Sequence, residues 1–328
     1  MNLSQIRAPL VPQSGEAIMP DTTSFSEGLF TLLRNGLERL HPDLSEAAGI
    51  SLSLIAVIFL VSIIRLIPGA KLKTAEFSGA VAIGTLLLQS TNSLIHLGIQ
   101  TVEEMSEYGK LLLSVMTSTL AAQGGVTSAT ALYAGTAFFD TLLTSVLTGL
   151  LNPMVYIFLV LSTANAALGE DILKKMAGFV KWLSVWMLKT VLYVFTGYMG
   201  ITGVISGTTD AAALKAAKLT ISGVVPVVGG ILSDASEAVL VSAGMVRNAA
   251  GIYGILAVLA VFLLPFLKIG CHYILLKLTG AVCGVFGVKQ CTELIGDFSA
   301  AMGLVLAMTG SVCLLQLIST VCFLRGVG

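Results

Sequence analysis

The chain has 328 residues, of which 55% are hydrophobic and only 11% are charged, and its mean hydropathy is +0.93. Soluble globular proteins carry about 25% charged residues, so this composition excludes a soluble domain. The 18 basic residues balance the 18 acidic residues, which leaves no overall positive charge for binding nucleic acid. Because backbone polar groups must pair with one another inside hydrocarbon, the predicted fold class is all-α, a polytopic helical membrane protein.

Residues 1–49 are more polar than the rest of the chain and hold three basic and six acidic residues. Residues 1–28 contain three prolines and lack the apolar core of a secretory signal. Apolar residues recur at helical spacing in Phe25–Leu40, which predicts a short amphipathic helix. The sequence therefore divides into a polar tail over 1–49 and a multi-span transmembrane domain over 50–328.

From residue 50 onward, apolar segments follow one another closely, and most approach the roughly 20 residues that a helix needs to cross a bilayer. Pro68 and Gly69 end the first segment, and Asn152 and Pro153 mark a later turn. Because some segments are too short to cross a membrane unaided, we expect about seven to nine transmembrane segments. The apolar segments are 50–67, 79–99, 111–122, 128–151, 154–168, 182–206, 219–245, 251–267, 272–288 and 298–323.

Charges between the apolar segments predict the orientation of the chain. Lysines gather in 68–78 and 169–181, and glutamates gather in 100–110. The positive-inside rule places the two basic segments in the cytoplasm, and the acidic segment and the tail outside. This arrangement requires an odd number of crossings between 111 and 168. The alternation of apolar residues and lysines within 169–181 predicts a helix that lies in the cytoplasmic interface.

One apolar stretch contains both helix breakers and two carboxylates. Pro226, Gly229 and Gly230 predict a break in a helix. Asp234 and Glu237 follow at the spacing of a capping box, in which the first residue caps the next half-helix. Intramembrane carboxylates also mark ion or transport sites, which broken helices often form. A cap, a transport or ion site and a partner-docking site therefore remain open for this pair.

Other polar residues within the apolar segments indicate pairing rather than catalysis. Asp140 and Lys189 are a candidate buried charge pair between two helices, and Asn92 and His96 are predicted to hydrogen-bond between helices. The sequence contains no phosphate-binding P-loop, zinc-protease motif or nucleophile elbow. With only three scattered histidines, we predict neither an enzyme nor a bound metal or cofactor.

Three long stretches resemble a known family. They are FTGYMGITGVISGTTDAAALKAAKLTISGVVPVVGGILSDASEAVLVSAGMVRNAAGIYG over 195–254, LLPFLKIGCHYILLKLTGAVC over 263–283 and DFSAAMGLVLAMTGSVCLLQLISTVCFLRG over 297–326. Together they resemble the stage III sporulation protein AE family of endospore-forming bacteria. The resemblance is strongest over about 180–326 and looser over 50–180. Members of that family usually begin with a cleavable signal sequence, which residues 1–28 do not resemble.

The resemblance implies a role rather than a chemistry. It implies a multi-pass subunit, in the mother-cell membrane around the forespore, of a channel or secretion-like complex that links the two cells. The implied partners are other stage III sporulation membrane proteins, including a secretion-type ATPase and ring-forming subunits, and a forespore-membrane protein. The complex would support forespore development and late forespore sigma-factor activity. The alternative is a self-contained secondary transporter with a broken-helix site at Pro226–Gly230 and Asp234/Glu237.

Overall fold

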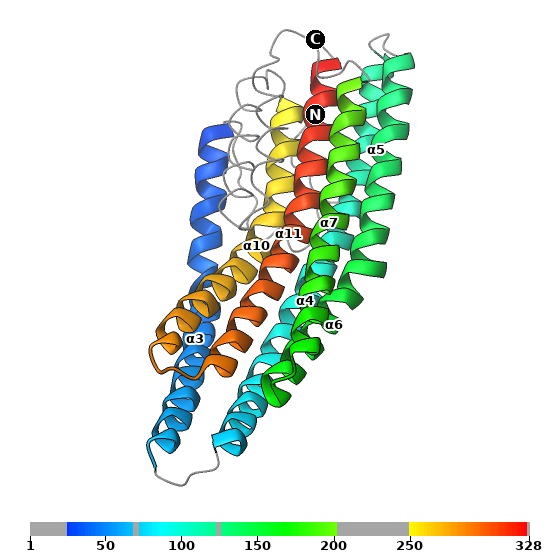
Figure 1. Cartoon of the computed structure of the whole chain (residues 1–328). Coiled ribbons are helices and arrows are strands. Elements are labelled where there is room, and N and C mark those ends of the chain that lie inside the picture. The colour runs from blue at the N-terminus through cyan, green and yellow to red at the C-terminus, as the bar shows by residue number, and fades with distance from the viewer. Residues whose placement is uncertain (1–24, 68–71, 123–125, 202–248, 327–328) are drawn as a thin grey trace.

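The structure is a computed structural model that describes residues 25–67, 72–122, 126–201 and 249–326 (Figure 1). Long helices account for nearly all of these residues and no strand occurs among them, which confirms the predicted all-α class. The helices are α3 (Phe25–Arg65), α4 (Leu72–Ala122), α5 (Val126–Val146), the π-helical turn η1 (Leu147–Leu151), α6 (Asn152–Leu168), α7 (Asp171–Ile201), α10 (Ala249–Gly284) and α11 (Lys289–Gly326).

Six helical segments of the described chain are long and apolar enough to cross a membrane. The predicted total of seven to nine is not confirmed, because several predicted segments join into single helices within the described residues. Segments 79–99 and 111–122 both belong to α4, and 251–267 and 272–288 both belong to α10. The glutamates and lysine that separate the two parts of α4 are good helix formers, so they interrupt the hydropathy without ending the helix. Segment 219–245 lies outside the described residues.

The predicted turn at Asn152 and Pro153 is absent. Instead, η1 joins α5 to α6, and the backbone N–H of Asn152 donates to the carbonyl of Leu147, five residues earlier. Proline has no N–H and is tolerated in the first turn of a helix, where Pro153 lies in α6. The wider π turn therefore accommodates the proline, and one continuous helical segment replaces two predicted ones.

The polar tail is also continuous with the first span. The described part of the tail, from Phe25, belongs to the same helix as the apolar segment that ends at Arg65. The predicted interfacial helix over 169–181 is likewise the first part of α7 rather than a separate element. At about 1.5 Å per residue, α4 is about 77 Å long, more than twice the hydrocarbon thickness of a bilayer.

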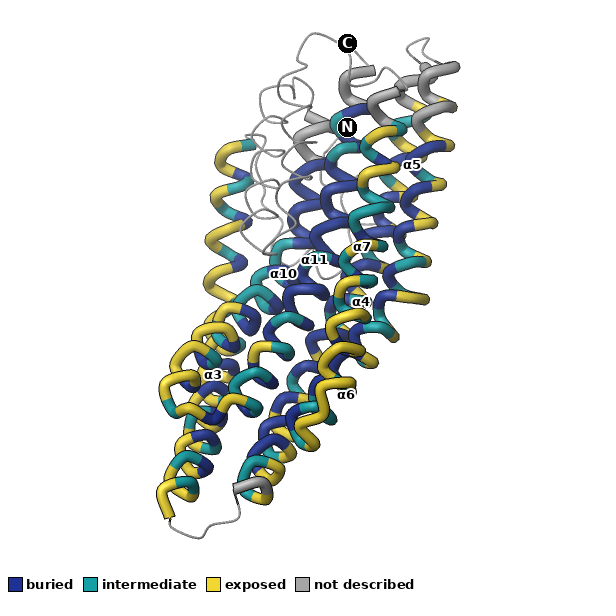
Figure 2. Tube along the Cα trace, in the orientation of Figure 1, coloured by how far each residue is buried: buried dark blue, intermediate teal, exposed yellow. Residues whose placement is uncertain are grey.

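Helix α11 forms the centre of the bundle. It packs most extensively against α10 and α4. In its most apolar stretch of 18 residues, 89% of the residues are buried, compared with 17% in the corresponding stretch of α7 (Figure 2). Phe298, Met302 and Leu306 are fully enclosed on this helix. The outer helices α3 and α7 instead expose large apolar side chains such as Phe59 and Trp182, as expected for surfaces that face lipid.

One end of the bundle brings together the end of α3, the start of α4, and the connections between α6 and α7 and between α10 and α11 (Figure 1). Arg65 of α3 pairs with Glu76 of α4, and Lys174 pairs with Glu293 at 2.8 Å. The described part of the first predicted basic segment, 72–78, therefore lies at the same end as the second, 169–181. The acidic segment 100–110 begins 24 residues beyond Glu76 along α4, about 36 Å away.

Cysteine labelling tests this arrangement in membranes. In a chain whose five native cysteines are replaced, we expect Glu170→Cys and Val285→Cys to react from the cytoplasmic side and Glu103→Cys from the opposite side, because α4 separates them by about a bilayer. The measurement is modification by a membrane-impermeant thiol reagent added to intact or opened cells. Leu54→Cys, at a fully buried position, is the unreactive control. Labelling of Glu170→Cys and Glu103→Cys from one side would contradict the orientation.

Candidate functional site

The predicted helix break and its acidic pair lie outside the described residues. Pro226, Gly229, Gly230, Asp234 and Glu237 all fall within 202–248. The capping and ion-site interpretations of Asp234 and Glu237 therefore both stay predictions. The remaining candidates from the sequence, Asp140 and Lys189, are described.

Asp140 lies on α5 and is 1% exposed. Both oxygens of its carboxyl group accept hydrogen bonds from neutral side chains of other helices. The Ser106 hydroxyl of α4 donates to Oδ2 at 2.6 Å, and the Gln316 amide of α11 donates to Oδ1 at 2.9 Å. Three helices thus meet at one buried polar cluster, which we call the Asp140 cluster and define as Asp140, Ser106 and Gln316.

The cluster depends on a close approach between α4 and α11. Gly109 lies directly against the side-chain amide of Gln316, so that a Cβ atom at this position would overlap it. The adjacent face of α5 is held by aromatic contacts, because Phe139 packs edge-on against Phe195 of α7 with ring centroids 5.5 Å apart. Tight packing on both sides therefore fixes the direction in which Asp140 points.

The predicted charge pair between Asp140 and Lys189 is not formed in the structure. Within the described chain, Asp140 makes its polar contacts with the Asp140 cluster, and no ion pair joins it to Lys189. Lys189 is half-buried on α7. Two neutral donors thus supply the partners that the sequence analysis expected from a lysine.

This arrangement gives Asp140 a chemistry that a fixed ion pair would not allow. The Ser106 hydroxyl can donate or accept, so the carboxyl group can bind or release a proton without losing that contact. Thr136 lies one turn earlier on the same face of α5, and its buried hydroxyl has no hydrogen-bond partner in the described structure. A buried carboxyl group held by neutral donors is a candidate for proton or cation exchange.

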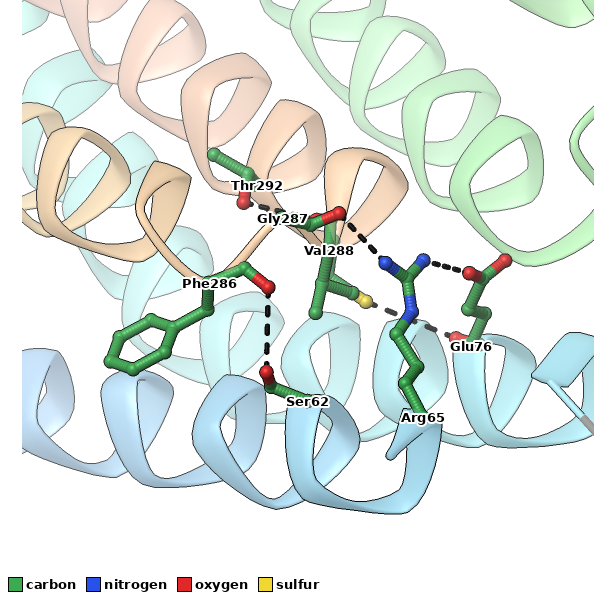
Figure 3. Close-up of polar contacts among 8 residues, drawn as sticks. Ser62, Arg65, Glu76, Phe286, Gly287, Val288 and Thr292 are labelled. Atoms are coloured by element: carbon green, nitrogen blue, oxygen red, sulfur yellow. Dashed lines mark hydrogen bonds and ion pairs between the residues drawn. The ribbon is translucent and has the colours of Figure 1, made fainter. Parts of the chain in front are cut away.

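A second polar cluster joins the end of α3 and the start of α4 to the turn between α10 and α11 (Figure 3). Arg65 at the end of α3 donates from Nη1 to the carbonyl oxygen of Gly287 at 2.7 Å, and its other terminal nitrogen pairs with Glu76 of α4. Ser62 donates to the carbonyl of Phe286 at 3.4 Å. We call these five residues the Arg65 clamp.

The turn between α10 and α11 offers its carbonyl groups because of its backbone conformation. Gly287 has φ = +72°, a left-handed conformation that glycine adopts without steric cost. Phe286 packs edge-on against Phe59 of α3 at 5.8 Å between ring centroids. The Arg65 clamp therefore joins the end of α3 and the start of α4 to the α10–α11 turn by both polar and apolar contacts, which indicates a structural role.

Sequence analysis identified Asp140 but missed its partners and the Arg65 clamp. Ser106 and Gln316 lie 34 and 176 residues from Asp140 along the chain, and serine or glutamine in an apolar helix has many alternative roles. The available signal was Gln316, a polar residue inside a long apolar segment. No group of three or more histidine, cysteine, aspartate or glutamate side chains in the described residues could hold a metal ion.

Substitutions at Asp140 separate hydrogen bonding from ionisation. Asp140→Asn keeps an acceptor for Gln316 and a donor for Ser106, so we expect near-normal stability. Asp140→Ala leaves two buried donors unpaired, which costs about 1–3 kcal/mol. The measurement is the temperature midpoint of aggregation in detergent, together with the amount of protein in membranes. Equal midpoints for the alanine and asparagine variants would contradict the contacts described above.

Comparison with known proteins identifies a family for this chain. The family model for Stage III sporulation protein AE matches residues 44–325. Stage III sporulation protein AE of Bacillus subtilis (strain 168) is 22% identical over 213 residues, which are 64% of this chain and 53% of that relative. The match thus spans about half the length of the curated relative, and no solved structure matches the chain. Because the family model covers most of the residues, the chain belongs to the stage III sporulation protein AE family.

Proposed function

We propose that this protein is an integral membrane subunit of a channel or secretion-like complex that links the mother cell to the forespore. The observation that carries the proposal is the family match over 44–325, which covers every described helix beyond the first part of α3. The six apolar helical segments support a membrane location. In this proposal the protein lies in the mother-cell membrane around the forespore and supports forespore development and late forespore sigma-factor activity.

The proposed partners supply what this chain lacks. Its sequence has no nucleotide-binding P-loop, so energy for transport would come from a secretion-type ATPase in the same complex. Ring-forming stage III sporulation proteins and a forespore-membrane protein would complete the passage between the two membranes. The subunit itself would act without catalysing a reaction.

Gene deletion tests the role. We expect the deletion strain to grow normally in rich medium and to stop sporulating after engulfment, because the family role belongs to spore formation. The measurements are growth rate, heat-resistant spore counts and microscopy of forespores. Complementation with the intact gene is the control. A growth defect accompanied by normal spores would contradict the proposal.

The second candidate function is a self-contained secondary transporter. It rests on the sequence pattern in which Pro226, Gly229 and Gly230 precede Asp234 and Glu237. In this case the carboxylates would bind an ion or relay protons, whereas the channel-subunit proposal requires only a helix cap at this position.

The double variant Asp234→Asn with Glu237→Gln separates these roles. Both amides keep hydrogen-bond acceptors suited to a capping box, so a purely structural pair predicts normal protein amounts and normal spore counts. Loss of a cap by Asp234→Ala, the matched control, would cost about 1 kcal/mol. A double amide variant that accumulates normally but fails to support sporulation would instead show that the charges bind an ion or a partner.

A further inference from the structure

The outward face of α4 is polar over a long distance. Exposed polar residues recur every three or four positions, the spacing of a single helical face. We call this face the polar stripe and define it as Thr85, Gln89, Asn92, His96, Gln100 and Glu103. The opposite face of α4 carries buried apolar residues such as Ile83, Leu87 and Ile95, so the packing of the bundle holds the polar stripe outward.

Neighbouring helices expose apolar side chains instead. Phe59 and Ile63 of α3 are 49% and 42% exposed, and Ile157 and Val160 of α6 are 50% and 63% exposed. Both helices pack against α4. On α4 itself, Leu86 and Leu88 are 41% and 43% exposed, so the polarity is confined to the polar stripe and is not a property of the whole surface.

Charged residues bracket the depth of the polar stripe in the membrane. Glu76, in the Arg65 clamp, and Glu103 are the charged residues that bound the uncharged part of α4, residues 77–102, about 39 Å long. On α3, Asp43 lies about 33 Å before Arg65 and pairs with Lys268 at 3.1 Å. These levels enclose a band close to the thickness of a hydrocarbon core, and Gln89 and Asn92 lie near its middle.

Hydrocarbon is a poor environment for these side chains. Amide and imidazole groups whose hydrogen-bonding capacity is unmet are costly in lipid. The polar stripe presents four such side chains in succession, of which Gln100 donates to Glu104 of the same helix at 2.8 Å. The Tyr156 hydroxyl of α6 donates to Asn92 Oδ1 at 2.7 Å, which meets only part of the hydrogen-bonding capacity of Asn92. Beside this contact lies a groove of about 350 Å³ with room for several water molecules. Its lining is mixed, with the polar residues Gln89, Thr91, Asn92 and Tyr156 beside the apolar residues Leu88, Ile95 and Leu159.

Water covers the polar stripe better than a tightly packed second copy does. Copies of one chain inserted in one membrane share an orientation, so close pairing of two polar stripes would bring Glu103 and Glu107 of each copy against the same residues of the other. Like charges in close contact repel strongly when water is excluded. A water-filled space between the copies keeps these carboxylates solvated and supplies hydrogen bonds to the amides.

We propose that the polar stripe of α4 borders a water-filled path through the membrane, whose remaining wall is supplied by further copies of this chain. The path takes polar solutes and favours cations, because Glu103, Glu104 and Glu107 outnumber Lys110 at one mouth and acidic rings select cations. This inference deepens the proposed channel role, and it can fail while that role holds.

Cysteine reactivity in sporulating cells tests the proposal. In the full-length chain without native cysteines, Thr85→Cys, Gln89→Cys and Asn92→Cys are compared with Ile157→Cys and Val160→Cys, the exposed apolar controls on α6. The cysteine thiolate attacks methanethiosulfonate reagents, and the thiolate forms in water and not in hydrocarbon. We therefore expect the three α4 positions to react at least about tenfold faster than the controls.

Charge selectivity provides the second measurement. At Gln100→Cys, a cationic methanethiosulfonate should react faster than an anionic one, and the difference should shrink when Glu103→Gln and Glu107→Gln are added. Reaction rates at the polar stripe equal to those at Ile157 and Val160 would overturn the proposal. Ready disulfide formation between copies at Asn92→Cys, with no access for either reagent, would also overturn it by showing a dry seam.

These readings stay separate from the role in sporulation. Labelling is measured on the protein itself. Thr85→Cys replaces a hydroxyl by a thiol and removes one methyl group at an exposed position, so it provides a reporter even where larger changes disturb packing. If deletion of the gene blocks sporulation but the cysteine variants label slowly at every α4 position, the water path is refuted and the proposed function still stands.

Discussion

The requirement that polar groups find partners when they leave water governs this bundle. In the interior, an unpaired donor or acceptor is costly, and the chain meets the cost with contacts between distant segments. The Arg65 clamp joins the end of α3 to the turn before α11. The Asp140 cluster joins α4, α5 and α11 through two hydrogen bonds. Both clusters therefore specify which helices lie side by side, whereas apolar packing alone would allow many arrangements.

The polar stripe is the exception that gives this requirement a functional meaning. Its side chains point away from the bundle, where Tyr156 of α6 donates to Asn92 and the remaining contacts of the stripe are within α4, from Thr85 to Val81 and from Gln100 to Glu104. Either lipid contacts these polar side chains, which is unfavourable, or water or another polar surface covers the polar stripe. The apolar outward faces of α3 and α6 show that this chain places apolar residues where lipid is expected. The departure on α4 is therefore most simply explained by water.

Sequence reasoning predicted the helical class and the membrane location but not the helix boundaries. Glutamates around 103–107 and the Asn152–Pro153 pair were interpreted as breaks, yet glutamate favours helices and proline fits the first turn of α6 after a π turn. Asp140 stood out as an intramembrane carboxyl group, but its neutral partners came from helices remote in sequence. No local pattern could identify Ser106 and Gln316 without the fold.

The polar stripe, in contrast, was accessible from the sequence, because its spacing needs only the helical period and no tertiary contact. What the sequence lacked was the direction of that face, and tertiary contacts supply it. Gly98 lies against Val305, and Gly109 against Gln316, with no space for a Cβ atom at either position. Ser106, between Glu103 and Glu107, points inward to Asp140. Turning α4 by one residue would break that hydrogen bond and drive polar side chains into the core, so the packing against α11 and the outward polar face are two consequences of one helix orientation.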